Sequence, residues 1–600
     1  MLKCQICLQK KCSTYQNRQV NNCLSVLNLL IKFLSQPRPG DRITVFSIKM
    51  KLIFYPLLFL ILIWGCKQKE VDTVERPSVF SLNSVFINGK NSGFVYKDLN
   101  TNPVIKLAFS NRIDNASLQK GIILYNSRNE SIAYKSTFEG NGSELTIQPD
   151  VLLSQLSNYK LALSDALKSP DGGKLQIPVT ISLTTSIDST DKFPRLTDEE
   201  LLALVQKQTF KYFWDFAHPV SGLARERNSS GDVVTSGGSG FGIMTIPVAI
   251  ERKFITRAQG LERMQKIVAF LKDKTQKFHG AFPHWIHGAT GAVVPFSTKD
   301  NGADLVETSF LMQGLLTSRQ YFNNPDETEK TLRADINSLW RGVEWNWFQK
   351  NKEDVLYWHW SPQYNWDMNL PVKGWNESLI TYVLAASSPT FPITKQVYEN
   401  GWTGNGNFIN GKEFYGIRLP LGEDYGGPLF FAHYSFLGIN PTGLTDKFTN
   451  YFTQNRNHSL INYNYCRTNP LKHSGYSDSC WGLTASDIPD GYNANSPYSD
   501  KGVIAPTAAL SSFPYTPTES MQALKFFYYK LGDKTWGEYG FRDAFSINQL
   551  WFAESYLAID QGPIIIMIEN YRSALLWNLF MSCPEVKIGM RDLGFQSPAL

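Results

Sequence analysis

Positions 78–186 alternate between apolar and polar residues in short runs. The clearest runs cover residues 84–87, 104–109, 122–125 and 145–147, and polar turns such as Asn88-Gly89 separate them. A period of two, broken by turn residues at intervals of about 8–12 residues, is typical of strands in a β-sandwich. We therefore predict an all-β domain over residues 78–186, followed by a polar linker at residues 187–194.

After residue 194 the apolar positions take the spacing of amphipathic helices. Thr197-Asp198-Glu199-Glu200 is a capping box, with Thr as the N-cap and Glu three residues later. The helix that it starts ends near Pro219. Helical spacing recurs at residues 256–271, 327–348, 377–386, 446–463, 519–531 and 545–558. With aromatic-rich loops and no βαβ alternation, residues 195–600 favour an all-α toroid over a parallel α/β fold.

The glycine-rich segment at residues 236–242 invites comparison with a phosphate-binding loop. It lacks the Gly-Lys-Ser/Thr ending of such loops, and no strand is predicted before it. We predict instead a tight loop that enters a helix at Met244, with its backbone close to a ligand.

The start of the chain has the pattern of a targeting signal. Met50-Lys51 opens a basic segment, and residues 52–64 form an almost unbroken apolar run. The run is too short to span a bilayer and has the length of a signal-peptide core. A small residue then precedes Cys66, which resembles a bacterial lipobox. We expect a signal peptide at residues 50–65, lipidation at Cys66 and a tether at residues 66–77; a plain secretory signal is the alternative.

That interpretation makes residues 1–49 an upstream extension foreign to the native protein, and places the protein in the outer membrane or on the cell surface as a lipoprotein. Residues 1–49 carry a net charge of +7 against +6 for the whole chain, so the remainder is near neutral. No nucleic-acid partner is expected, since that would need a basic patch. We expect a monomer that contacts the membrane through its lipid anchor.

The cysteines give little indication of chemistry. Cys4 and Cys7 could be half of a zinc knuckle, but no second pair follows at a metal-ligand spacing. A disulfide between Cys466 and Cys480 is possible in an exported domain, and Cys583 would stay free. Catalysis by cysteine is not expected, because no His stands in a recognisable partner motif.

Asp300, Asp304 and Glu307 are the first candidates for chemistry. If residues 300–307 are helical, the three carboxylates fall within about 60° of one another, because each residue turns a helix by about 100°. In a pocket, like charges raise one another's pKa. The alternative is a solvated first helical turn, where acidic residues are favoured by the helix dipole.

Aromatic residues favour the pocket. Phe282-Pro283-His284-Trp285 precedes the three carboxylates, and fourteen of the fifteen Trp lie beyond residue 187. Sugar rings present C–H faces that stack on aromatic rings. Hydrolysis of a glycosidic bond uses two carboxyl groups, one protonated and one ionised, whose pKa values the surroundings push apart. These patterns together indicate a saccharide hydrolase.

Two segments of the chain each resemble a known protein family. Residues 78–186, with PVIKLAFSNRIDNASL and YKLAL, are similar to bacterial immunoglobulin-like domains of the SbsA-like type, which usually act as spacers; carbohydrate binding is the alternative. Residues 195–585 resemble the glucoamylase-like domain family that includes glycoside hydrolase family 144, the bacterial β-1,2-glucanases. The matching segments are TFKYFW (209–214), GFG (240–242), FPHW (282–285), DLVET (304–308), GWNE (374–377), WGLTASD (481–487) and AIDQGP (558–563).

The second resemblance implies an (α/α)6 barrel, anomeric inversion, and neither metal nor cofactor. It implies Glu377 as general acid and an acidic pocket lined by Asp300, Asp304 and Glu307. Asp560 is our candidate for general base; a helix C-terminal turn residue is the alternative. The candidates for substrate binding are His284, Trp285, Trp375, Asn376, Trp481, Asp487, Tyr492 and Gln561.

The expected substrate is a β-glucan, above all a β-1,2-linked one. Another glucan linkage or a short oligosaccharide is the alternative among enzymes, and a non-catalytic glycan-binding lipoprotein is the alternative outside them. Endo and exo cleavage are not distinguished, because loop length around the cleft decides between them; residues 401–430 could close one end.

Overall fold

The computed structural model describes residues 78–600. The predictions for the start of the chain, including lipidation of Cys66 and the pair Cys4 and Cys7, lie outside the described residues. Within residues 78–600, no helix combines the length and apolarity that crossing a membrane requires.

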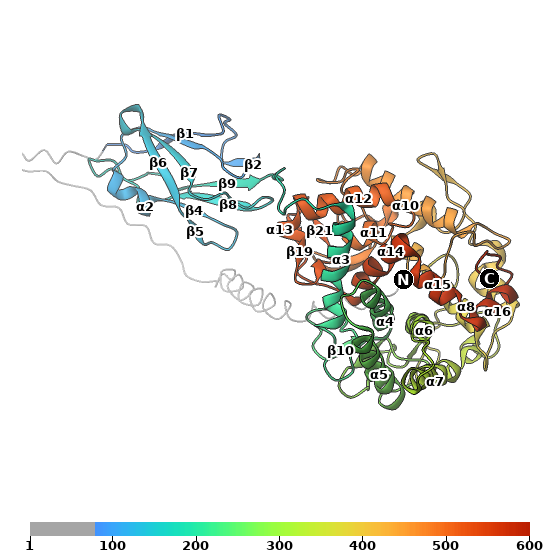
Figure 1. Ribbon diagram of the computed structural model, residues 1–600. Helices are drawn as coiled ribbons and strands as arrows, with labels where there is room; N and C mark the ends of the chain where they lie inside the picture. The colour runs from blue at the N-terminus through green and yellow to red at the C-terminus, as the bar shows by residue number, and fades with distance from the viewer. Residues whose placement is uncertain (1–77) are drawn as a thin grey trace, which may run out of the picture. The chain divides into compact units, whose positions relative to one another are not determined.

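The N-terminal part of the described chain is a β-sandwich (Figure 1). One sheet has the order β1 (Leu82–Ile87), β3 (Ile105–Phe109), β7 (Glu144–Pro149) and β6 (Tyr134–Glu139). The other has the order β2 (Val95–Leu99), β9 (Val179–Thr185), β8 (Asn158–Leu163), β4 (Ile122–Tyr125) and β5 (Ser131–Ile132). Alternate residues of both sheets, such as Leu107 and Leu161, are fully buried. The predicted all-β region is confirmed.

The helical part alternates along the chain between helices buried on one face and helices buried almost all round. The one-sided helices are α3 (Asp198–Trp214), α5 (Arg257–Asp273), α7 (Glu327–Gly342), α10 (Tyr451–Thr468), α12 (Pro517–Lys525) and α16 (Pro584–Leu593). The fully buried helices are α4 (Ser236–Glu251), α6 (Leu305–Tyr321), α8 (Leu379–Ser387), α11 (Pro506–Leu510) and α14 (Ala558–Ser573). A helix that is apolar all round belongs inside a larger core.

The buried helices contact one another in a series, since α4 packs on both α6 and α14, α6 packs on α8, and α14 packs on α11. In Figure 1, α5 and α7 lie outside α4 and α6. The one-sided helices therefore surround the buried ones. The N-terminal ends of α4, α6, α8 and α14 bring together most of the acidic residues considered above.

Glycines allow α4 and α6 to approach closely. A Cβ atom at Gly240 would lie 2.2 Å from the Phe310 carbonyl oxygen, and one at Gly314 would lie 2.2 Å from the Gly240 carbonyl oxygen. The prediction of a loop at residues 236–242 is therefore wrong. These residues form the first turns of α4, and their glycines serve helix packing.

Two other helix predictions need correction. Residues 545–558 are not a helix: β21 (Phe545–Ser546) pairs with β22 (Trp551–Phe552) as a hairpin, and Leu550 between them has φ of 51°. A short apolar run does not by itself distinguish strand from helix. The predicted helix at 446–463 begins later, at Tyr451, because the Asn450 side chain caps it by accepting a bond from the Thr453 N–H.

Local capping was predicted correctly at the start of α3. Thr197 Oγ1 accepts a bond from the Glu200 N–H, and Glu200 Oε2 accepts one from the Thr197 N–H. The possible disulfide between Cys466 and Cys480 is not formed; both thiols and that of Cys583 are free and buried.

Candidate active site

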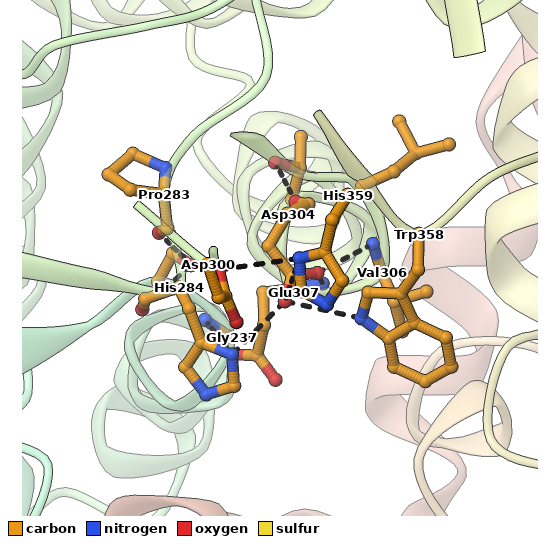
Figure 2. Close-up of polar contacts among 12 residues, drawn as sticks. Gly237, Pro283, His284, Asp300, Asp304, Val306, Glu307, Trp358 and His359 are labelled. Atoms are coloured by element: carbon orange, nitrogen blue, oxygen red, sulfur yellow. Dashed lines mark hydrogen bonds and ion pairs between the residues drawn. The ribbon is translucent and has the colours of Figure 1, made fainter. Parts of the chain in front are cut away.

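Asp304 is the N-cap of α6 and is fully buried. Its Oδ1 accepts bonds from the N–H groups of Val306 (3.0 Å) and Glu307 (2.9 Å). Its Oδ2 accepts bonds from His284 Nδ1 (3.0 Å) and Trp358 Nε1 (3.2 Å) (Figure 2). Burial alone would raise the pKa of Asp304, but the neighbouring histidines outweigh it and lower that pKa. Asp304 is therefore ionised, and both of its carboxylate oxygens already accept hydrogen bonds from the protein.

Two histidines balance this charge. His359 Nδ1 lies 3.3 Å from Asp300 Oδ1 and 3.8 Å from Asp304 Oδ2. Burial lowers the pKa of His284, but Glu307, Asp304 and Asp300 outweigh it and raise the pKa to about 10. The pKa of His359 is also raised, by Asp304 and Asp300 against the effect of burial. The His284 ring is thus a cation at neutral pH, and the carboxylates favour the same form of His359.

Glu307 lies in the first turn of α6 and reaches the start of α4. Its Oε2 accepts bonds from the Gly237 N–H at 2.9 Å and from Thr235 Oγ1 at 3.4 Å. A Cβ atom at Gly237 would lie 2.3 Å from the same oxygen, so a larger residue there would displace the Glu307 carboxylate. Burial raises the pKa of Glu307, and Asp304 adds to that rise.

Glu377 lies just before α8, and one of its carboxyl oxygens has no donor among the described residues. It is 5% exposed, and its Oε2 has no hydrogen-bond partner among residues 78–600. Burial raises its pKa to about 7, with Glu307 and Asp304 contributing. Its main chain is fixed, because Ser435 Oγ donates to the Glu377 carbonyl and accepts a bond from the Ile380 N–H. A buried carboxyl group with such a pKa is suited to donate a proton.

A second acidic group lies at the start of α14. Asp560 and Asp543 are each 2% exposed, and they lie close enough for each to shift the pKa of the other. Asp543 Oδ2 accepts a bond from the Asp487 N–H at 2.7 Å. Arg227 Nη1 lies 3.1 and 3.2 Å from the two oxygens of Asp487. Burial and the neighbouring carboxyl group raise the pKa of Asp560 well above its usual value. This group is separate from the one around Asp304.

Two tyrosines connect the two acidic groups. Burial raises the pKa of Tyr434, and the charges of Asp560, Glu377 and Glu307 raise it further. Asp560 likewise contributes to the raised pKa of Tyr492, whose side chain remains 43% exposed. Glu377 and Asp560 therefore both lie near Tyr434, and Tyr492 beside Asp560 reaches solvent. Glycosidic hydrolysis uses two carboxyl groups whose surroundings shift their pKa values.

The structure changes the prediction for the three carboxylates. They do not share a helical face: Asp300 lies in the preceding loop, Asp304 is the N-cap, and Glu307 alone lies within α6. The structure nonetheless brings them together through His284 and His359. Asp560 is likewise in the first turn of α14 and not at the end of a helix, since α14 continues through Pro563.

The candidates for substrate binding divide into two sets. His284 stacks on Phe296 with ring centroids 4.3 Å apart, and Trp285 packs edge-on against the same ring at 4.8 Å, so both accompany the acidic site. The prediction for Trp481 is wrong: it is fully buried and donates to the Glu519 carbonyl. Trp375 is also a core residue, 6% exposed and stacked on Tyr451.

Polar groups at two other candidates are engaged within the protein. Asn376 Oδ1 accepts a bond from the Ser378 N–H at the start of α8, and Gln561 Nε2 donates to the Phe541 carbonyl. Asp487 is held by Arg227. Sequence reasoning missed several residues of the site, namely Arg227, Trp358, His359, Tyr434 and Asp543. No motif marks them, because they reach the site from loops distant in sequence.

His284, Asp300 and Asp304 each offer one ligand atom, and these atoms lie within 4.8 Å of one another. A metal ion there would compete with a protonated His284 and with Asp304 oxygens that already accept four bonds. These side chains therefore favour protons on the histidines, and not a metal ion, as the positive charge that balances the carboxylates.

Asp304 should contribute more to stability than an ordinary N-cap. Asp326 caps α7 with the same two backbone bonds but is exposed, which makes Asp326→Ala a matched control. Losing an N-cap costs about 1 kcal/mol, and leaving buried donors unpaired adds about 1–3 kcal/mol each. Urea unfolding should therefore show a loss of about 3 kcal/mol or more for Asp304→Ala and about 1 kcal/mol for Asp326→Ala. Equal losses would contradict the anchoring role.

Comparison with known proteins places this site in context. Residues 369–584 match the Glycoamylase family, described as "Putative glucoamylase", and residues 95–185 match a bacterial Ig-like domain family. An endo-β-1,2-glucanase from Chitinophaga pinensis, solved with sophorotriose and glucose, is 54% identical with a TM-score of 0.66; the match covers 68% of this chain and all of that one. A β-1,2-glucanase structure from Parabacteroides distasonis is 39% identical with a TM-score of 0.65, covering 87% of this chain and 73% of that one.

A curated relative from Parabacteroides distasonis, an exo β-1,2-glucooligosaccharide sophorohydrolase acting at the non-reducing end, is 48% identical over 436 residues. The match covers 69% of this chain, and the chain spans 59% of that relative's length.

Proposed function

Because the chain belongs to the glucoamylase-like family that includes the bacterial β-1,2-glucanases, we propose that it hydrolyses β-1,2-glucan or its oligosaccharides. The observation that carries this proposal is Glu377, a buried carboxyl group with a pKa of about 7, whose Oε2 has no hydrogen-bond partner within residues 78–600. Like Asp560, it lies near Tyr434. A protein that only binds glycans would need hydrogen bonders and aromatic rings, not carboxyl groups with raised pKa values.

The proposed mechanism is inverting. Glu377 donates its proton to the glycosidic oxygen as the C1–O bond breaks, and Asp560 removes a proton from the water whose oxygen forms the new bond to C1. An inverting enzyme of this kind holds its two carboxyl groups about 6.5–9.5 Å apart, which leaves room for the water. The His284 cation and the fixed oxygens of Glu307 would bind sugar hydroxyl groups near the bond that is cleaved.

The same family supports an (α/α)6 toroid for the helical part. The alternation of one-sided and fully buried helices along the chain is the pattern such a fold produces, with α4, α6, α8, α11 and α14 as inner helices. Its open end would hold the N-terminal ends of the inner helices, where the acidic residues lie.

Linear β-1,2-glucan tests the proposal, with β-1,3- and β-1,4-glucans as controls for linkage. We expect product from the β-1,2 polymer or its oligosaccharides alone, released first as the α-anomer in proton NMR. A ladder of sizes would indicate endo cleavage, and a single disaccharide would indicate exo cleavage. No release from any of these glucans would contradict the proposal, and an initial β-anomer would contradict inversion.

We also propose export as a lipoprotein anchored through Cys66. Labelled palmitate should be incorporated into the protein in a bacterial host and should be lost in Cys66→Ala, while Cys583→Ala, which changes a buried cysteine, should still be labelled. Secretion of unlabelled wild-type protein would favour a plain secretory signal.

A further inference from the structure

Two buried carboxyl oxygens at the start of α14 lack a donor. Asp543 Oδ1 and Asp560 Oδ2 have no hydrogen-bond partner among residues 78–600. The two carboxyl groups nevertheless lie close enough for each to shift the pKa of the other. Ionised carboxylates only accept hydrogen bonds, and an unsatisfied buried charge is costly. A single proton between the two groups satisfies both oxygens.

We propose that Asp543 is a positioning residue that holds this shared proton while Asp560 acts as the base. With the proton on Asp543, its O–H donates to Asp560, which is then ionised and fixed in direction. The inference rests on the proposed function, because it concerns the residue assigned as base there. Nothing in the sequence pattern singles out Asp543.

Neighbouring groups hold the Asp543 side chain in place. With the shared proton, Asp543 and Asp560 together carry one negative charge. The Asp487 N–H donates to Asp543 Oδ2 at 2.7 Å, which leaves Oδ1 as the oxygen free to share a proton. The Asp487 carboxylate is itself paired with Arg227, and Ser555 Oγ donates to it. Arg227 also contacts Glu226 at 2.9 Å. Asp487 is thus already engaged, and Asp543 is the remaining carboxyl group that can share the proton.

The other groups facing the pair do not replace Asp543. The phenol of Tyr492 is held protonated, because burial and Asp560 raise its pKa. Thr507 Oγ1 donates to the Asp560 main-chain carbonyl and leaves the side chain unengaged.

The proton balance of a turnover is complete with these groups. Asp560 takes a proton from the attacking water, so the pair then holds two protons, while Glu377 has given one to the leaving oxygen. Release of one proton from the pair to solvent and uptake of one by Glu377 restore the starting state. One water is consumed, and no other reactant is needed.

Asp543→Asn and Asp543→Ala separate proton holding from packing. The Asn amide can accept from the Asp487 N–H and donate to Asp560, but it carries no charge. We expect Asp543→Asn to keep kcat within about tenfold of wild type, and Asp543→Ala to lose about 100-fold, in the range of general acid–base effects, with KM nearly unchanged. Asp367→Asn, an exposed partner of Lys299, is the surface control and should behave as wild type.

The pH dependence of kcat/KM distinguishes proton holding by Asp543 from a purely structural role. A hydrogen bond donated to a carboxylate favours its ionised form. Asp543→Ala removes the O–H that donates to Asp560, so the pKa of Asp560 should rise and the acid limb of kcat/KM should move to higher pH. Asp543→Asn keeps a donor and should leave the limb near its wild-type position. An unmoved limb in Asp543→Ala, or near-normal activity of that variant, would overturn the proposal.

Infrared spectroscopy tests the pair without activity. In Glu377→Gln at pH 8, the shared proton should give a carboxylic-acid C=O band that is absent from Glu377→Gln/Asp543→Asn. An identical band in both variants would overturn the shared proton even if the glucan assay succeeds. A wild-type protein that cleaves no glucan but shows the band would instead contradict the proposed function alone.

Discussion

Glu377→Gln should lower kcat by three or more orders of magnitude and leave the fold intact. General acid catalysis contributes about 10²–10⁴ in rate, and the glucose leaving group is too basic to depart without a proton. The amide has the shape of the carboxyl group, and Glu377 Oε2 has no partner among the described residues to lose. Stability and substrate binding should therefore change little. Glu327→Gln, the same change at an exposed site on α7, is the matched control.

The pH dependence gives a second test of Glu377. The pKa is raised to about 7, so the protonated, active form dominates below that pH and is lost above it. Wild-type kcat/KM should fall as pH rises through about 7, and this limb should be absent from the residual activity of Glu377→Gln. A substrate with a nitrophenyl leaving group needs little protonation and should recover much of the lost rate. Near-normal hydrolysis of glucan by Glu377→Gln would reassign the acid.

The sequence predicts those features that depend on residues close to one another along the chain. The capping box at Thr197 starts α3 because its two bonds join residues three apart. The apolar residues of 545–558 fit both the helical and the strand period, and pairing between β21 and β22 decides between them. The glycines of α4 suggest a loop in the sequence because their packing partners, Phe310 and Gly314, lie some seventy residues away along the chain.

The same distinction explains the site. Asp304, Glu307 and Glu377 stand in motifs and were found, although their arrangement on one helical face was wrong because Asp304 ends the loop as an N-cap. Arg227 meets Asp487 across 260 residues of sequence, and Asp543 meets Asp487 across 56. Such contacts leave no periodic signal. They are determined by how α14 and its preceding hairpin pack, and the environment that raises the pKa of Asp560 becomes visible only in three dimensions.

Asp560→Asn should also lower kcat strongly, by about 10²–10⁴, because no other group takes the proton from water. A small anion can replace the base: azide needs no deprotonation and would attack C1 from the same side as water. We therefore expect azide to restore turnover in Asp560→Asn and to give the α-glycosyl azide. It should not rescue Glu377→Gln, whose defect is at the leaving group. Asp367→Asn again controls for the loss of an acidic side chain.

The configuration of that product tests the role of Asp560. A β-glycosyl azide would mean that azide displaced a covalent intermediate on another residue, so that Asp560 would be an acid/base group and not the nucleophile. Loss of rescue together with normal folding would mean that Asp560 positions the sugar and that the base lies elsewhere. An α-glycosyl azide fits the loss of either a base or a nucleophile, and release of the α-anomer by the wild type then leaves the requirement for a carboxylate that acts on water alone. Asp560 can meet that requirement only while the proton it shares resides on Asp543.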